Sequence, residues 1–297
     1  MGFGDNLDSR RERRESLSPQ MERAYQDAQR MFKDPTYTIQ MSEFKGFYDS
    51  KMLEEDAQLV DALSHRFAAR NETEQDRNSK KMADAFEGML LTHVRKNFWF
   101  GNAEAMKTSL FDDYINHADL LAELKSKQFG QQVLALNVDV TFGLTKINEK
   151  LTYIQEQVEK DKAGSIRYFR HSDSSSRGER DHIPHVVIGV SQSVVEELAR
   201  LSSLDDKNAL RAHPIQRILL EQIYAQLKHV SEYAHAHGKL VAEAAYAHSL
   251  PILEALLKEK SHIGTTLAKD PVNLEIMRNL KERFKVGPAE PHLDLQH

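Results

Sequence analysis

A two-residue alternation of side-chain character between residues 133 and 142 constrains the fold of this chain more than any other feature. The even positions are large and apolar, whereas the odd positions are small or polar. Because successive side chains of a β-strand point to opposite faces, the pattern predicts a strand with one face in a core. The even set is Leu134, Leu136, Val138, Val140 and Phe142, and the odd set is Val133, Ala135, Asn137, Asp139 and Thr141.

The preceding residues, 118–124, alternate in the same way and predict a second strand. The charged segment between the two strands ends in Phe129-Gly130, which favours a hairpin. If the turn is centred near Phe129, Asp119 and Asp139 lie roughly opposite each other on the non-core face, with side chains on the order of 5 Å apart. Two such carboxylates either share a divalent cation, for which Mg²⁺ or Mn²⁺ is suited, or point into water, one of them towards a lysine of the following helix.

The composition restricts the class of protein to which these strands belong. Hydrophobic residues make up 40 % of the 297 residues and charged residues 29 %, as in a globular protein with polar appendages. The formal net charge of −5 means that any nucleic-acid contact needs a local basic patch. Cysteine is absent, which excludes disulfides and thiolate metal sites and suits a reducing compartment. No apolar run approaches roughly 18 residues and no secretory signal is evident, so we expect a cytoplasmic protein with no membrane partner.

Several signature motifs are missing from the sequence. It contains no GxxxxGK[ST] loop, no HExxH, no GxSxG and no GxGxxG after a strand. These absences give no support to a P-loop hydrolase, a zinc peptidase of the HExxH type, a nucleophile-elbow hydrolase or a dinucleotide-binding enzyme.

Changes in composition divide the chain into regions. The polar stretch 71–80 is a candidate boundary, and the helices of the C-terminal region either pack on the core or offer a surface for a partner such as a second copy. The pair His235 and His237 is expected at the surface. The predicted regions are a flexible arm at 1–20, N-terminal helices at 21–80, an α/β core at 81–204, C-terminal helices at 205–287 and a tail at 288–297.

Within the α/β core the predicted elements are a helix, two or three strands, a helix, two further strands and a last helix. This order predicts a mixed sheet that contains a hairpin and a crossover. The segments that carry it are helix 81–98, strands 118–124 and 133–142, helix 144–158, strand 166–170, a serine-rich loop at 171–181, strand 185–190 and helix 191–201.

This arrangement resembles the PD-(D/E)XK nuclease superfamily, which includes restriction endonucleases and archaeal Holliday junction resolvases. The resemblance implies a restriction-endonuclease-like αβββαβ core with a glutamate on the first helix, an aspartate on the second strand and a (D/E)-x-K triplet on the third. Glu87 corresponds to the glutamate, Asp119 to the aspartate and Asp139 to the first acid of the triplet. Thr141 stands where the family has lysine.

The resemblance further implies a nuclease that hydrolyses phosphodiester bonds, with DNA as the expected substrate and Mg²⁺ or Mn²⁺ as the cofactor. Asp119 and Asp139 would hold the metal together with Glu87 and Asp113, although Asp113 and its neighbour Asp112 are equally placed to cap a helix.

Cationic residues complete the expected site. Lys146 or Lys150, one helical turn apart, would replace the missing lysine, and an arginine group would contact the nucleic-acid backbone or remain in a solvated loop. An alternative from another class is a catalytically inactive nuclease-like fold that binds protein or nucleic acid, which Thr141 favours. The arginines are Arg167, Arg170, Arg177 and Arg180.

Overall fold

The computed structural model describes residues 16–70, 73–141, 145–173 and 176–285, and for residues 70, 137–141 and 145 it describes the backbone alone. The strands are β1 (Glu104–Lys107), β2 (Leu120–Ser126), β3 (Gly130–Thr141), β4 (Gly164–Arg170), β5 (Arg177–Ile183) and β6 (His185–Ser191). The helices are α2 (Pro19–Met31), α3 (Ser50–Arg70), α4 (Glu74–Lys96), α5 (Leu110–Ile115), α6 (Thr145–Glu159), α7 (Gln192–Ser203), α8 (Lys207–Ala212), α9 (Ile215–Ala236), α10 (Leu240–His248), α11 (Leu250–Glu259) and α12 (Pro271–Arg283), with the 3-10 helices η1 (Met41–Phe44), η2 (Lys260–His262) and η3 (Thr266–Lys269).

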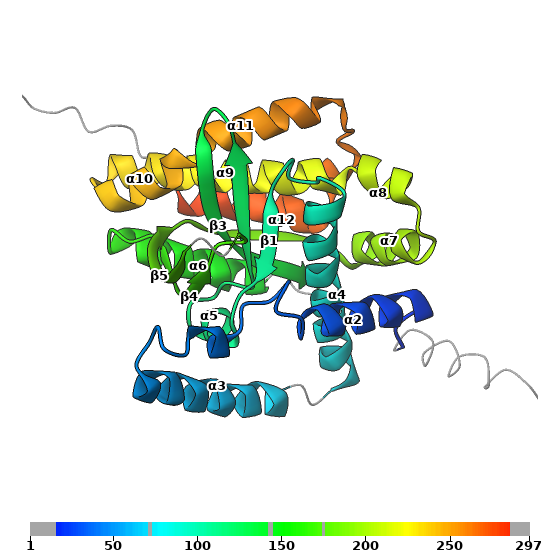
Figure 1. The fold of residues 1–297 in the computed structure, drawn as a ribbon. Helices are drawn as coiled ribbons and strands as arrows, with labels where there is room; N and C mark the ends of the chain where they lie inside the picture. The colour runs from blue at the N-terminus through cyan, green and yellow to red at the C-terminus, as the bar shows by residue number, and fades with distance from the viewer. Residues whose placement is uncertain (1–15, 71–72, 142–144, 174–175, 286–297) are drawn as a thin grey trace, which may run out of the picture.

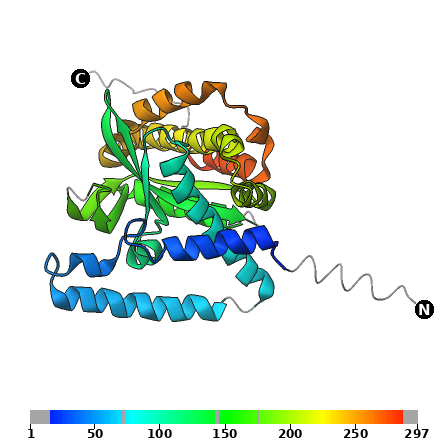
Figure 2. The same ribbon diagram turned by 45° about the vertical axis from the view of Figure 1, so that its right-hand side comes forward.

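A mixed four-stranded sheet is the centre of the fold, with strand order β1-β2-β3-β6. The first three strands form an antiparallel meander, and β6 returns parallel to β3 through α6 and the separate β4–β5 hairpin. In both ribbon views the C-terminal helices, coloured yellow to red, gather above the sheet and α3 lies along the opposite side (Figure 1 and Figure 2). The predicted mixed α/β class, with helices at both ends of the chain, is therefore confirmed.

The alternation that predicted β2 and β3 separates two hydrophobic clusters. Leu134 and Leu136 lie in the main cluster, which α4 also enters, whereas Val133 and Ala135 lie in a second cluster with buried residues of β4 such as Tyr168. The even face is in a core, as predicted. The odd face of the described strand residues is also covered, because α5 and the β4–β5 hairpin pack against it.

The register of the β2–β3 hairpin differs from the prediction by two residues. Ser126 pairs with Gly130, so the turn is centred at Gln128 and not at Phe129. The last pair is Leu120 with Leu136, and the same register continued by one residue sets Asp119 against Asn137. The prediction that Asp119 lies directly opposite Asp139 is therefore wrong. In this register the two residues are diagonal neighbours, for which Cα separations of about 7–8 Å are usual.

Three further elements differ from the sequence prediction. Helix α4 begins at Glu74 and not near residue 81, because the Thr73 hydroxyl caps it by accepting the N–H of Asp76 at 3.1 Å. The expected loop at 171–181 contains the start of β5. Strand β1 has only four residues, which is too short to produce a recognisable alternation.

The C-terminal helices close the free edge of β6. Two buried glutamines of α9 each complete a backbone pair: Gln226 accepts the N–H of Val187 at 2.7 Å and donates to its carbonyl at 2.6 Å, and Gln222 does the same for Gly189 at 3.0 and 2.9 Å. An edge strand left open would expose unpaired backbone groups. Packing of the C-terminal helices on the α/β core is thus observed.

The segment Leu240–His262, which covers α10, α11 and η2, is long and apolar enough to cross a membrane by length and composition alone. This corrects the expectation from sequence that no such run exists. Buried core helices pass the same test, and Tyr246, Leu253 and Leu256 of this segment belong to the main hydrophobic cluster.

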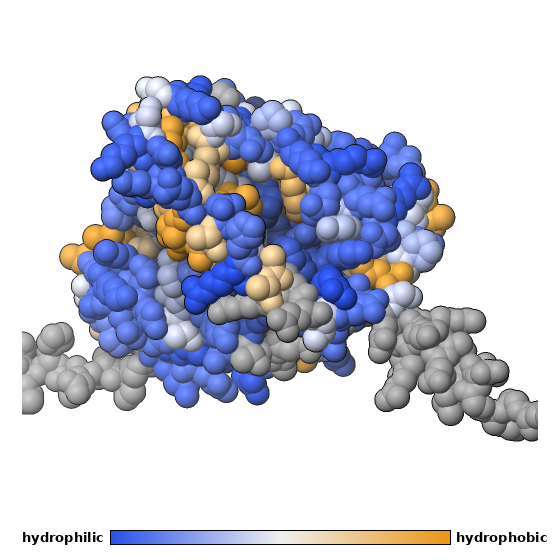
Figure 3. Space-filling model, turned by 90° about the horizontal axis from the view of Figure 1, so that it is seen from below, coloured by the Kyte–Doolittle hydropathy of each residue, from blue (hydrophilic) through white to orange (hydrophobic). Residues whose placement is uncertain are grey.

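From below, the molecular surface is mostly hydrophilic, with small separate hydrophobic patches (Figure 3).

Candidate active site

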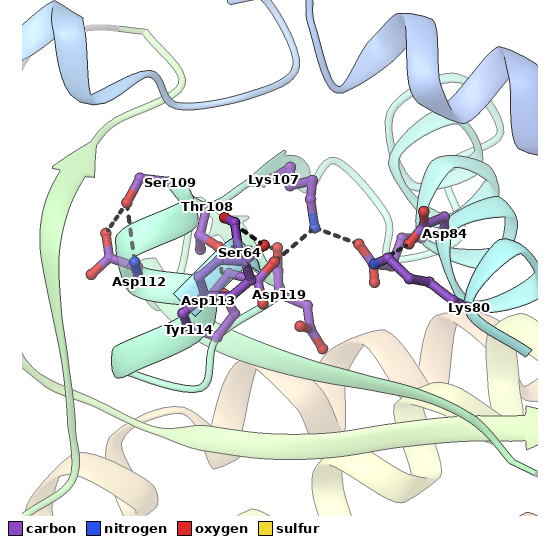
Figure 4. A network of polar contacts seen from close by, with 12 residues as sticks. Ser64, Lys80, Asp84, Lys107, Thr108, Ser109, Asp112, Asp113, Tyr114 and Asp119 are labelled. Carbon is purple, nitrogen blue, oxygen red and sulfur yellow. Dashed lines mark hydrogen bonds and ion pairs between the residues drawn. The ribbon is translucent and has the colours of Figure 1, made fainter. Parts of the chain in front are cut away.

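Lys107 of β1 is the centre of a buried ionic cluster (Figure 4). Its Nζ lies 2.6 Å from Oε2 of Glu87 and 3.4 Å from Oδ2 of Asp113. The Lys107 and Glu87 side chains are each 9 % exposed and that of Asp113 is 22 % exposed, so water screens these charges weakly. The ammonium group also lies 4.8 Å from the ring centroid of Phe32, in a cation–π contact.

The backbone around Lys107 is held on its outer side by a neighbouring segment. The Lys107 N–H donates to the carbonyl of Tyr37 at 2.8 Å, and the N–H of Ile39 donates to the Lys107 carbonyl at 2.9 Å. The β1–β2 register pairs Lys107 with Leu120, the residue after Asp119. The Lys107 side chain therefore projects from a backbone held by hydrogen bonds. Its partner on β2, Leu120, is the sequence neighbour of Asp119, a candidate metal ligand.

Different local structures deliver the acidic residues to Lys107. Glu87 is buried on α4 beside Phe86 and Gly88, where Gly88 permits close packing of α4 on α2: a Cβ on Gly88 would lie 2.5 Å from Cβ of Ala28. Asp113 follows the cap of α5. Asp119 precedes β2, and its N–H donates to the carbonyl of Leu136 at 3.1 Å.

Asp119 also meets a lysine from the other side of the cluster. Nζ of Lys150 on α6 lies 3.9 Å from Oδ2 of Asp119, and the two side chains are 25 % and 16 % exposed. Lys146, one turn earlier on α6, is exposed to solvent. Of the two lysines proposed from sequence, the structure brings Lys150 to an acidic residue of the site.

Glu87 and Asp113, the two carboxylates paired with Lys107, have raised pKa values. Burial raises the pKa of Glu87 to about 8, although Lys107 opposes the shift, and the neighbouring charges of Asp119 and Asp113 raise it further. Burial and the charge of Asp119 likewise raise the pKa of Asp113 to about 6 against the opposing effect of Lys107. Burial lowers the pKa of Lys107, but the acidic neighbours outweigh it and the net direction is upward. Burial is thus the main reason that both carboxyl groups keep a proton to a higher pH than exposed side chains do.

A second pair on α4 extends the polar network one turn away from Glu87. Nζ of Lys80 lies 3.5 Å from Oδ1 of Asp84. Burial raises the pKa of Asp84, while Lys80 and Lys107 lower it. This carboxylate adds to the negative potential around Lys107, and no part of the sequence analysis identified it.

The side chains of Asp139 and Thr141 lie outside the described residues. Their backbones belong to β3, where Asp139 pairs with Gly189 and Thr141 with Ser191 of β6.

Asp112 has a structural role that separates it from its neighbour Asp113. It is fully buried and accepts the backbone N–H groups of Arg167 at 2.7 Å and Tyr168 at 3.0 Å. Ser109 caps α5 by accepting the N–H of Asp112 at 3.1 Å, and its hydroxyl donates back to the Asp112 carboxylate. Asp112 thus belongs to a helix cap that also fixes β4, whereas Asp113 faces Lys107.

The four arginines proposed to contact nucleic acid fall into two classes. Arg167 binds Asp56 of α3 at 3.1 Å, and Arg170 binds Glu43 at 3.0 Å. Arg177 and Arg180 are exposed on β5. Arg180 contacts His171 at 2.9 Å. The structure therefore does not gather the four into one solvent-facing patch.

Residues that the sequence analysis did not select also surround Asp119. His117 packs edge-on against Tyr153 of α6, with ring centroids 4.5 Å apart, and His185 lies buried beside Tyr153 at 6.2 Å. Lys107 is the most important omission. The string Lys107-Thr108-Ser109 carries no local signal of a buried cation, because the cluster forms only when α4, β1 and α5 come together.

The donor set was compared with what a divalent cation requires. Carboxylate oxygens suit Mg²⁺ and Mn²⁺. Burial is the main cause of the raised pKa values of Glu87 and Asp113, and it favours the neutral form of both groups. Among the described residues, no group of three or more histidine, aspartate or glutamate side chains is placed to hold a metal ion. The type of donor atom suits a divalent cation, but the described residues alone do not make up a set of ligands.

Comparison of the chain with protein families, curated proteins and solved structures gives no match.

Proposed function

We propose that this protein is a Mg²⁺- or Mn²⁺-dependent nuclease that cleaves phosphodiester bonds in DNA. The observation that carries the proposal is the gathering of Glu87, Asp113 and Asp119 around Lys107 at one end of the sheet. The order of elements supports it: α4, β1, β2, β3, α6 and β6 follow one another as in an αβββαβ core, with α5 and the β4–β5 hairpin inserted.

In this proposal Asp119 and Asp139 hold the metal ion from adjacent strands. When bound, the ion polarises the phosphoryl oxygen and lowers the pKa of a water molecule. Lys150, beside Asp119 and partly exposed, stabilises negative charge on the phosphate. Lys150 on α6 thus takes the role of the family's lysine, whose position in this chain is occupied by Thr141.

Binding of the DNA backbone is assigned to the exposed cations. Arg177 and Arg180 are accessible on β5, whereas Arg167 and Arg170 already bind carboxylates. Such contacts give salt-dependent affinity without reading sequence. The proposed protein works on DNA in the cytoplasm.

A second candidate function is a nuclease-like fold that has lost catalysis and serves as a binding module. The specific observation in its favour is that Lys107 already neutralises part of the acidic cluster. The position against Asp119 in the β2–β3 register is Asn137, an uncharged residue. Both features reduce the number of carboxylates available to a metal.

Mn²⁺ titration calorimetry combined with a plasmid-nicking assay distinguishes the two functions. The nuclease proposal expects wild-type protein to bind Mn²⁺ and nick plasmid, and expects Asp139→Ala and Asp119→Asn each to lose both. Asp61→Asn, on the exposed face of α3, is the matched control and should behave as wild type. Metal binding without nicking in the wild type would favour the inactive module. Absence of binding at millimolar Mn²⁺ would contradict the nuclease proposal.

A further inference from the structure

A cavity of about 370 Å³ lies where the start of β3, the end of β5 and α10 meet, and no described residue of the Lys107 cluster lines it. It forms at a free edge of the sheet. The parallel β3–β6 ladder begins at the pair Ala135 and His185, so residues 131–133 of β3 have no strand beside them on that side in the described part of the chain. The volume is within the range of sites for small molecules.

Two buried polar side chains line this cavity from opposite sides, Gln132 of β3 and Ser249 at the end of α10. They are 9 % and 1 % exposed, and neither side chain has a hydrogen-bond partner among the described residues. Their polar atoms remain accessible from the cavity, unlike the ring nitrogens of His185, which are fully buried. Because buried polar groups are normally hydrogen-bonded, the two side chains indicate a ligand that supplies the partners.

The backbone of the cavity wall adds further polar groups. The N–H of Ala135 donates to the carbonyl of Pro184 at 3.0 Å. Since backbone groups alternate in direction along a strand, the N–H and carbonyl of Val133 point to the same side, before the first residue of β6. On the facing wall His182 has a φ of 61°, a left-handed conformation that is uncommon outside glycine. The cavity therefore offers hydrogen-bond donors and acceptors from several elements.

We propose that this cavity binds an adenine nucleotide, with the base beside Gln132 and the phosphate at Arg180. A glutamine amide presents a donor and an acceptor side by side, which is the pair that matches the N6 and N7 positions of adenine. Ile183 and Pro184 give the flat ring an apolar wall. Arg180 is exposed, and its contact with His171 at 2.9 Å uses one of five N–H donors, which leaves others for a phosphate.

The charges around the cavity define the ligand further. Asp181 also lines it and offsets part of the charge of Arg180, so a monophosphate is favoured over a triphosphate. A larger groove of about 470 Å³ between α9 and α10 lacks these features. Glu232 and Glu243 line that groove, where they would repel a phosphate, and its His235 already contacts Glu243 at 2.9 Å. The inference concerns a separate site and does not rest on the nuclease proposal.

The test is titration calorimetry on the full chain with adenosine monophosphate (AMP), adenosine and guanosine monophosphate (GMP). We expect AMP to bind with a dissociation constant below about 1 mM. Adenosine lacks the phosphate and GMP lacks the N6 amino group, so each should bind at least about tenfold more weakly. Gln132→Leu and Arg180→Met should each weaken AMP binding at least about tenfold. Gln75→Leu at the exposed start of α4 and Arg177→Met on the exposed face of β5 are the matched controls and should bind AMP as wild type does.

Three results would overturn the inference: no binding of AMP at about 10 mM, equal affinity for AMP and GMP, or equal affinity of wild type and Gln132→Leu for AMP. Gln132→Leu should unfold at no lower urea concentration than wild type, because its amide bonds no described residue, so a loss of binding in this variant reports on the site. A destabilised Gln132→Leu would mean that the amide has a structural partner, and would also overturn the inference.

A single-stranded oligodeoxyadenylate distinguishes the two sources of the nucleotide. If it binds more tightly than AMP and depends equally on Gln132, the cavity takes a nucleotide within a strand. If AMP binds and the oligonucleotide does not, the cavity takes a free nucleotide, and both results support recognition of the base. Plasmid nicking by Gln132→Leu should equal that of wild type, so the nuclease proposal and this one stand or fall separately.

Discussion

The two outer strands of the sheet carry buried polar groups of opposite kinds. At β6, the amides of Gln222 and Gln226 each meet one backbone N–H and one carbonyl. At β1, the charged Lys107 faces Glu87 and Asp113, two carboxyl groups whose pKa values are raised. Both arrangements are largely buried, yet only the first pairs its polar groups one to one.

This difference separates a structural arrangement from a candidate functional one. Neutral groups that pair one to one stabilise a strand edge and have no reason to change state. Glu87 and Asp113 lie near a buried lysine and have pKa values of about 8 and 6. They are therefore able to exchange protons or a cation near neutral pH. The same sheet therefore uses one edge to join the C-terminal helices and the other to gather charge.

The largest effect is expected from breaking the charged cluster. Lys107→Met keeps most of the side-chain length but leaves Asp113, which is ionised at pH 7, without its cation, whereas Glu87 with its pKa of about 8 is mostly protonated there. Removing one partner of a buried ion pair costs about 3–5 kcal/mol. Urea unfolding at pH 7 should show this loss, whereas Lys162→Met at an exposed turn should stay within about 0.5 kcal/mol of wild type. A loss below about 1 kcal/mol would contradict the picture of a buried, paired lysine.

The next effect comes from opening the β6 edge. Gln226→Leu leaves the N–H and carbonyl of Val187 without partners, and each unsatisfied buried group costs about 1–3 kcal/mol. We expect a loss of about 3 kcal/mol by urea unfolding, with no change in metal binding. Gln75→Leu, at the exposed start of α4, is the control. A neutral result for Gln226→Leu would mean that the amide pairs do not stabilise the edge.

The sequence predicted those features that depend on local periodicity. Helices α2 and α3 lie in the region predicted to hold N-terminal helices, and the alternation of residues 133–136 correctly divided β3 between two faces. Gln222 and Gln226, four residues apart on the buried face of α9, offered a signal that was overlooked. Buried amides one turn apart in an apolar stripe need partners, and a strand edge can supply them.

Features that depend on tertiary approach were not predictable in the same way. The hairpin register changed by two residues because the turn is centred at Gln128, and pattern alone does not fix a turn. Lys107 was missed because its partners come from α4 and α5, at sequence separations of 20 and 6 residues. Candidate acids could be named from the sequence, but the cation between them could not.

A smaller, pH-dependent effect sharpens the comparison between the two edges. The pKa of Glu87 rises from 4.5 to about 8 on folding, so the folded protein binds a proton that the unfolded chain releases. Stability from this group is complete below pH 4.5 and is lost as the pH rises towards 8. Between pH 6.5 and pH 7.5 the wild type should lose up to about 1.4 kcal/mol relative to Glu87→Gln. An equal change in the free energy of unfolding between the two pH values for wild type and Glu87→Gln would contradict this expectation. Gln226→Leu should show the same pH dependence as the wild type.

The smallest effect at neutral pH is expected at His185, the first residue of β6. Its ring nitrogens have no hydrogen-bond partner among the described residues, and Gly164 packs so closely that a Cβ there would lie 1.9 Å from the ring. Burial lowers the pKa of His185 to about 4, so stability from this group is complete above pH 6.5 and is lost as the pH falls towards 4. His185→Leu should therefore lie within about 1 kcal/mol of wild type at pH 7.5.

Below pH 6.5 the free energy of unfolding of His185→Leu should rise relative to that of the wild type by up to about 1.4 kcal/mol per pH unit. The trend is opposite in direction to that of Glu87→Gln, because one buried group resists losing a proton and the other resists gaining one. Urea unfolding at pH 5 and pH 7.5 measures it, with His65→Leu on the exposed side of α3 as the control. Equal acid sensitivity of His185→Leu and wild type would show that His185 becomes protonated without cost, and that the β6 edge, like the β1 edge, tolerates a buried charge.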